Sequence, residues 1–116
     1  MTPDAFRRLA LSQPEVVEVY HRGHSEFRVL QRSFASLGGP ADSAAMVQLT
    51  SEQQAMFMPA APRSFVPVPG GWGRLGATSV VLVRAKEAIV ESALGLAWRN
   101  IAPKSLVQSI DEPKIS

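Results

Sequence analysis

The pattern of hydrophobic and polar residues along the chain predicts three helices. In each of them, apolar side chains recur three or four positions apart and therefore share one side. The last helix has the widest apolar stripe, which requires a sheet to pack against. Thr2 and Thr50 stand where the first two helices begin and can cap their free N–H groups, and Pro59 ends the second helix. The predicted helices cover residues 3–12, 51–58 and 86–101.

Shorter segments that alternate, or that are rich in β-branched and aromatic residues, predict strands. The first four follow one another through short connections, so they form an antiparallel meander. Arg22-Gly23-His24 is typical of a turn, and Gln31-Arg32 predicts a tight hairpin. The last segment is apolar on both faces, which indicates an internal strand. The predicted strands cover residues 16–21, 27–30, 33–37, 45–49, 65–66 and 78–83.

This order of elements predicts an α+β fold. We expect a two-layer α/β sandwich, an antiparallel sheet with the helices on one face, in the order α-β(3-4)-α-β(1-2)-α. Residues 1–108 form a single domain, and residues 109–116 form a flexible C-terminal tail. The second face of the sheet is then exposed, or used for dimerisation or for ligand binding.

Composition narrows the class of protein. Apolar residues make up 46% of the 116 residues and charged residues 19%, which is typical of a globular domain. The absence of cysteine excludes disulfides, thiol nucleophiles, zinc–thiolate sites and iron–sulfur clusters. The longest strongly apolar run, residues 80–83, is too short to span a bilayer. We therefore expect a cytoplasmic location and no membrane partner.

The charge is unevenly distributed, although the net charge is only +2. No acidic residue lies between Glu52 and Glu87, an interval that contains Arg63, Arg74, Arg84 and Lys86. A second basic cluster contains Arg22, Arg28 and Arg32, with His21 and His24 beside it. Local positive patches attract phosphates or acidic partners. The alternative interpretation, that these residues are scattered over a solvated surface, has equal weight.

The segment from Gly71 to Gly76 satisfies the pattern G-x-G-x-x-G. A dinucleotide site needs these glycines between a strand and a helix, whereas a strand is predicted to follow here, so we expect no nucleotide site. Trp72 has two interpretations. It can stack on a base while Arg74 contacts a phosphate, or it can fold back over the edge of the sheet.

His21 and His24 raise the question of a metal site or a catalytic base. They lie three positions apart on a turn, with Glu18 and Glu26 near them in the sequence, and a clear third ligand is lacking. A base would also need a nucleophile or an orienting carboxylate within reach. We expect no metal site, no catalytic residue and no cofactor, and hence that the protein is not an enzyme.

Several stretches together resemble the MmcQ/YjbR family across about residues 2–106. They are residues 6–14, 23–29, 34–37, 49–54, 65–76, 97–98 and 102–106. The resemblance implies a small α/β domain related to CyaY-like and secretion-chaperone-like folds. It also implies DNA binding through a double-wing arrangement. Family members often carry Gly-Lys at the hairpin tip where this chain has Gln31-Arg32, so the charge is kept but the flexible glycine is not.

Two functional hypotheses follow. The first is a non-enzymatic protein that binds DNA through the basic hairpin and the glycine-rich wing; its candidate residues are Arg22, Arg28, Arg32, Trp72, Arg74 and Lys104. It requires that the two segments project on a common side of the sheet. The second is a protein-interaction or chaperone-like module, which acts through the exposed sheet face or as a homodimer.

Overall fold

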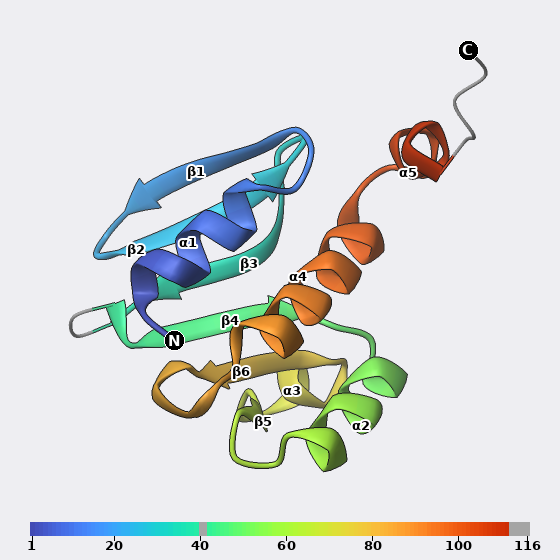
Figure 1. The fold of residues 1–116 in the computed structure, drawn as a ribbon. Coiled ribbons are helices and arrows are strands. Elements are labelled where there is room, and N and C mark those ends of the chain that lie inside the picture. The colour runs from blue at the N-terminus through green and yellow to red at the C-terminus, as the bar shows by residue number, and fades with distance from the viewer. Residues whose placement is uncertain (40–41, 112–116) are drawn as a thin grey trace.

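A computed structural model describes residues 1–39 and 42–111 of the chain. Its centre is a six-stranded antiparallel sheet with the strand order β1-β2-β3-β4-β6-β5 (Figure 1). The elements are α1 (Pro3–Leu11), β1 (Val16–His21), β2 (His24–Val29), β3 (Arg32–Gly38), β4 (Ala44–Gln48), α2 (Ser51–Ala60), β5 (Phe65–Pro67), α3 (Gly71–Arg74), β6 (Ala77–Val81), the 3₁₀ helix η2 (Leu82–Arg84), α4 (Glu87–Ile101) and α5 (Lys104–Asp111).

The hydrophobic core lies between the sheet and the helices α1 and α4, which pack on one of its faces (Figure 1). Alternate residues of each strand point into it, and Phe27 and Val47 are fully buried there. Phe6 of α1 meets Phe27 edge-on, with 6.2 Å between the ring centroids. Trp98 of α4 is 2% exposed, and its Nε1 donates to Pro14 O at 2.9 Å. The predicted α+β sandwich is therefore confirmed.

The predicted helix starts are confirmed by their caps. Thr2 Oγ1 accepts the Ala5 N–H at 3.1 Å, and Thr50 and Gln53 form a reciprocal capping box. The predicted end of the second helix is wrong, because α2 includes Pro59 and continues to Ala60. A proline this close to the C-terminus removes only one intrahelical hydrogen bond. None of the helices in residues 1–39 and 42–111 is long and apolar enough to cross a membrane.

Helix α2 is attached to the sheet by a polar side chain that the apolar pattern does not reveal. Gln54 is 9% exposed, and its Nε2 donates to Gly73 O at 3.0 Å, Ala77 O at 3.3 Å and Thr78 Oγ1 at 3.1 Å. Ala55, the apolar residue that follows Gln54, is exposed. Because buried amides need partners, this network fixes α2, α3 and β6 relative to one another.

The second hairpin turns one residue earlier than predicted. Its two-residue loop is Leu30-Gln31, with φ of 46° and 73°, and Val29 pairs with Arg32. Positive φ at both loop residues gives the twist that a two-residue hairpin requires. Arg32 is consequently the first residue of β3 rather than part of the turn. The prediction of Gln31-Arg32 as the hairpin tip is wrong by one residue.

Near the C-terminus, β6 lies between β4 and β5 and is internal, as predicted, but it ends at Val81 and the chain continues as η2. Helix α5 extends to Asp111, where two hydrogen bonds of 2.8 and 2.6 Å join its carboxylate to Arg99 of α4. The first three residues of the predicted tail, 109–111, are therefore helical. The rest of that tail lies outside the described residues.

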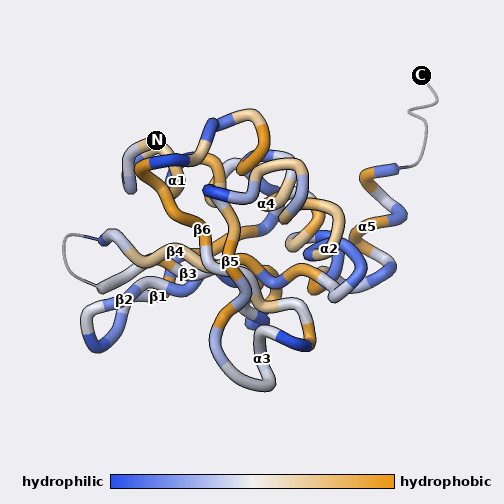
Figure 2. The backbone as a smooth tube through the Cα atoms, turned by 90° about the horizontal axis from the view of Figure 1, so that it is seen from below, coloured by the Kyte–Doolittle hydropathy of each residue, from blue (hydrophilic) through white to orange (hydrophobic). Residues whose placement is uncertain are grey.

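A one-turn helix, α3, occupies the segment that we expected to be a loop. It lies on the face of the sheet opposite α1 and α4, and the turn between β1 and β2 bends toward the same side (Figure 2). Helix α3 is held close to the backbone before it, since a Cβ on Gly73 would lie 1.7 Å from Val68 O. Glycine at this position is what allows the approach.

This close approach predicts different outcomes at two glycines of the same helix. We expect Gly73→Ala to lower the free energy of unfolding by about 1–3 kcal/mol, because the added methyl group overlaps the Val68 carbonyl. Gly71→Ala is the control, since its Cβ would meet no atom within 4 Å. It should change stability by about 1 kcal/mol or less. Urea unfolding followed by circular dichroism measures both, and equal stabilities would contradict the arrangement.

Candidate binding surface on the open face of the sheet

The open face is the side of the sheet turned away from α1 and α4 (Figure 2). Strand register decides which residues belong to it, because side chains alternate between the two faces. Residues that alternate with the buried core residues, or that pair with such alternating residues on the next strand, point to it. They include Val17, Val19, His21, His24, Glu26, Arg28, Ser36, Met46, Gln48, Ser79, Val81 and Val66. The surface is thus polar over β2 and mixed over β4, β6 and β5.

The hairpin of β1 and β2 forms one side of this surface. Its loop is Arg22-Gly23, with φ of 52° and 83°, so that His21 pairs directly with His24. Both loop residues are exposed. The loop therefore presents Arg22 to solvent at the tip of the hairpin.

Glu26 is the centre of a charged network on this hairpin. Its Oε2 lies 2.5 Å from Arg28 Nη2 and 3.2 Å from His21 Nε2. Hydrogen bonds from Arg28 and then from His21 lower the pKa of the Glu26 carboxyl from its ordinary value, against the opposing effect of burial. Arg28 is thus partly neutralised, which reduces its attraction for an external phosphate.

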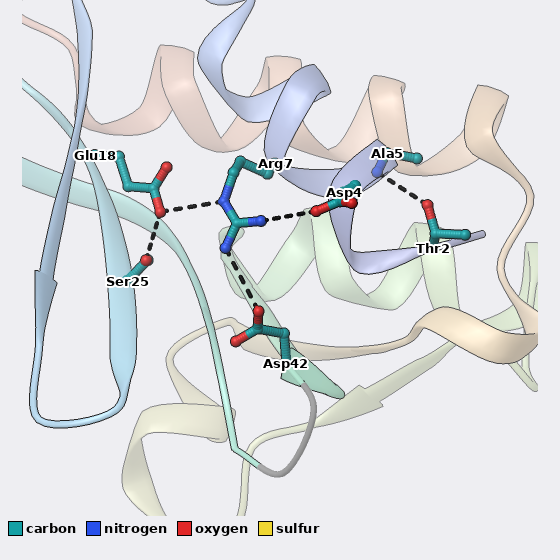
Figure 3. Close-up of polar contacts among 7 residues, drawn as sticks. All are labelled: Thr2, Asp4, Ala5, Arg7, Glu18, Ser25 and Asp42. Carbon is teal, nitrogen blue, oxygen red and sulfur yellow. Dashed lines mark hydrogen bonds and ion pairs between the residues drawn. The ribbon is translucent and has the colours of Figure 1, made fainter.

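On the opposite face, Arg7 of α1 holds the hairpin in place (Figure 3). Its guanidinium contacts Glu18 of β1 at 3.2 Å, Asp4 at 3.0 Å and Asp42 at 3.5 Å. Glu18 also accepts a hydrogen bond of 2.5 Å from Ser25 of β2. These contacts connect both strands of the hairpin to α1 and to the segment before β4, so they fix the hairpin against the body of the domain.

Helix α3 forms the other side of the surface. The Gly-rich pattern provides the backbone for its single turn, and β6 follows directly after it. The exposed fractions are 70% for Trp72 and 75% for Leu75, which lie three residues apart on one side of the turn. Arg74 is also exposed. Trp72 therefore does not fold back over the edge of the sheet.

The six predicted binding residues lie in four places. Arg22 and Arg28 belong to the β1–β2 hairpin, and Trp72 and Arg74 belong to α3, so these four residues come from the two elements that flank the open face. The other two, Arg32 and Lys104, come from β3 and α5.

Arg32 begins β3 beside the Leu30-Gln31 turn, at the end of β2 opposite the Arg22-Gly23 turn. Lys104 is the first residue of α5. The structure therefore does not bring Arg32 together with Arg22, because consecutive hairpin turns lie at opposite ends of their shared strand.

The basic residues of the acid-free interval do not form one patch with Arg74. Arg63, Arg84 and Lys86 instead line a separate cavity of about 310 Å³, beside Ile89 of α4. This cavity lies where the end of α2, the start of β5 and the start of α4 meet. The basic residues between Glu52 and Glu87 therefore lie in two separate places: Arg74 on α3, and the other three at the cavity.

Several residues of the candidate surface were not predicted from the sequence. Leu75 was not singled out, although its position three residues after Trp72 would place both on one side of a helix. Val66 was predicted as part of a strand but not as an exposed contact. Gln54, which positions α3, carries no local signal of burial, because its partners come from distant parts of the sequence.

The lowered pKa of Glu26 predicts a pH-dependent contribution to stability. A carboxylate with a depressed folded pKa stabilises the protein above its unfolded pKa of about 4.3, and this contribution is lost as the pH falls through the folded pKa. We expect Glu26→Gln to lower stability by less than about 1 kcal/mol at pH 7, and by less still at pH 3. Urea unfolding at both pH values measures the difference in unfolding free energy between the variant and the original protein. Glu91→Gln on α4 is the control. A difference for Glu26→Gln that is larger at pH 3 than at pH 7 would refute the interpretation.

Comparisons with known proteins bear on the fold alone. No family model matches the sequence. No curated protein matches it either. Among solved structures, the chain is similar to the protein DR2400 of Deinococcus radiodurans, which contains a domain of the family DUF419. The TM-score is 0.71 at 16% sequence identity, over 97% of this chain and 89% of that one. The chain therefore shares the small α/β fold of that DUF419 domain protein.

Proposed function

We propose that this chain is a non-enzymatic protein that binds DNA on the open face, between the β1–β2 hairpin and α3. The observation that carries the proposal is the exposed indole of Trp72 on the same short helix as the exposed Arg74. An aromatic ring offers a stacking surface for a base, and a guanidinium offers a paired donor for a phosphate. The DNA binding that the MmcQ/YjbR resemblance implies supports the same conclusion.

The charges of this surface favour a polyanion. On the open face, the two flanking elements present three cations, Arg22, Arg28 and Arg74, and one carboxylate, Glu26, whereas Glu18 of β1 points to the opposite face. Among the described residues, Arg22 and Arg74 have no carboxylate within ion-pair distance. Both are therefore available to a phosphate, whereas Arg28 must first exchange its contact with Glu26.

The geometry favours single-stranded over duplex DNA. Trp72 can stack only on a base whose face is uncovered, which a single strand provides and a duplex interior does not. Phosphate contacts from arginines on the two sides would position the strand without reading its sequence. The proposal is thus sequence-tolerant binding with a strong salt dependence.

Fluorescence anisotropy with a labelled single-stranded oligonucleotide tests this proposal. We expect Trp72→Ala to weaken binding by about 1–3 kcal/mol, because one stacked base is lost. Arg74→Gln should lower the slope of log affinity against log salt by about 1, because one phosphate contact is lost. A duplex of equal length should bind more weakly than the single strand.

Arg63→Gln provides a matched control, because it removes the same charge from the separate cavity rather than from α3. It should leave both the affinity and the salt slope close to those of the original protein. Absence of binding at micromolar protein and low salt would refute the proposal, and so would equal effects of Arg63→Gln and Arg74→Gln.

A protein partner is the second candidate, and one observation favours it. Three exposed apolar side chains lie in or near the edge strand β5 and helix α3: Val66, Trp72 and Leu75. Exposed apolar clusters mark protein interfaces, and tryptophan is frequent among their strongest contacts. The partner would be a second copy of this chain or another protein.

A substitution at Leu75 distinguishes a protein partner from DNA, because this side chain offers apolar contact but neither a charge nor an aromatic ring. If the surface holds a second copy, light scattering after size exclusion should show a dimer, and Leu75→Ser should shift it to monomer by removing buried apolar area. A monomer at all concentrations would contradict dimerisation through this face. Unchanged DNA binding by Leu75→Ser would favour the first candidate.

We also infer that the chain is a member of the MmcQ/YjbR family with a cytoplasmic location. The resemblance in residues 65–76, which form β5 and α3 here, supports membership. The fold shared with the DUF419 domain protein is compatible with it. A solved family member whose glycine–tryptophan segment lay on the helix-covered face would count against membership.

A further inference from the structure

Three potential metal ligands meet on the β1–β2 hairpin: His21, His24 and Glu26. The Arg22-Gly23 turn places His21 directly opposite His24, with 4.5 Å between the ring centroids. Glu26 lies two residues beyond His24 on the same strand, and therefore on the same face of the sheet. The two histidines thus acquire, through strand register, the third ligand that their sequence spacing does not supply.

The distances suit a single small ion. One ligand atom from each of the three side chains lies within 4.8 Å of the other two. His21 Nε2 and Glu26 Oε2 are 3.2 Å apart, close to the roughly 3.3 Å that separates two ligands of a tetrahedral zinc ion with bonds of about 2.0–2.1 Å. Rotation of the exposed His21 ring and the half-buried His24 ring can close the remaining gap without moving the backbone.

We propose that His21, His24 and Glu26 bind a divalent transition-metal ion. Two imidazoles and one carboxylate suit zinc and its neighbours rather than magnesium or calcium, which prefer oxygen ligands. Three protein ligands leave at least one coordination position open to water or to a ligand atom from a partner. The site stands on the hairpin geometry alone and is independent of the DNA-binding proposal.

Two neighbours define the character of this site. Gly38 of β3 lies opposite His24, and a Cβ there would come within 2.4 Å of His24 Cβ, so glycine makes room for the histidine. Arg28 contacts the same Glu26 Oε2 that lies 3.2 Å from His21 Nε2, so an ion between those two atoms would share Oε2 with the guanidinium, while Oε1 is the other carboxylate oxygen. The positive charge of Arg28 repels a cation, so we expect a dissociation constant in the micromolar range rather than the tight binding of a structural zinc site.

Calorimetric titration of the untagged protein with Zn²⁺ tests the proposal, with Mg²⁺ as the comparison ion. We expect one saturable Zn²⁺ site and no Mg²⁺ binding at equal concentration. His21→Gln, His24→Gln and Glu26→Gln should each weaken Zn²⁺ binding at least about tenfold, because each removes a direct ligand. Glu91→Gln, which removes an exposed carboxylate from α4, should leave binding unchanged.

Nuclear magnetic resonance gives an independent readout, because the chain contains only two histidines. Zn²⁺ should shift the imidazole signals of both histidines together, with one midpoint. All three ligand side chains are at least partly exposed, so the variants should fold, and circular dichroism checks this. Absence of saturable binding at millimolar Zn²⁺, a shift of one histidine only, or equal binding by the His21→Gln variant would overturn the proposal.

Discussion

The two-residue turn Arg22-Gly23 sets the register on which the candidate surface depends. Positive φ at both residues makes His21 pair with His24, so that Glu26 and Arg28 point to the open face while Phe27 points into the core. A slip of one residue would exchange the two faces, which the burial of Phe27 prevents. The hydrophobic core thus determines which charges the protein presents to a partner.

Two polar networks then fix the elements on either side of that face. Arg7 connects α1 to Glu18 of the hairpin, and Gln54 connects α2 to Gly73 and Thr78. Both residues belong to helices, yet each positions an element of the candidate surface rather than the core. Because the hairpin and α3 are attached to the body independently, the space between them is preorganised, and a ligand would not have to order either one.

Local sequence patterns predict most of the elements, because apolar spacing and cap residues act over a few positions. Thr2, Thr50 and the internal β6 illustrate this. These patterns fail where residues distant in the sequence determine whether a side chain is buried or on which face of the sheet an element lies. Gln54 is buried because three acceptors surround it, and the surface role of α3 depends on which side of the sheet the chain crosses. The candidate metal site shows the same limit. Glu26 lies beside His21 and His24 only because of the strand register across the Arg22-Gly23 turn, which the sequence spacing does not reveal.

The central claim is that the β1–β2 hairpin and α3 form one binding surface. Mapping of amide and indole chemical shifts during titration with a single-stranded oligonucleotide tests it most directly. We predict that the signals of Arg22, Arg28 and the Trp72 indole move together, with one midpoint, while the signal of the buried Trp98 indole stays unchanged. Shifts confined to one of the two elements, or gathered on α4 and α5, would contradict it.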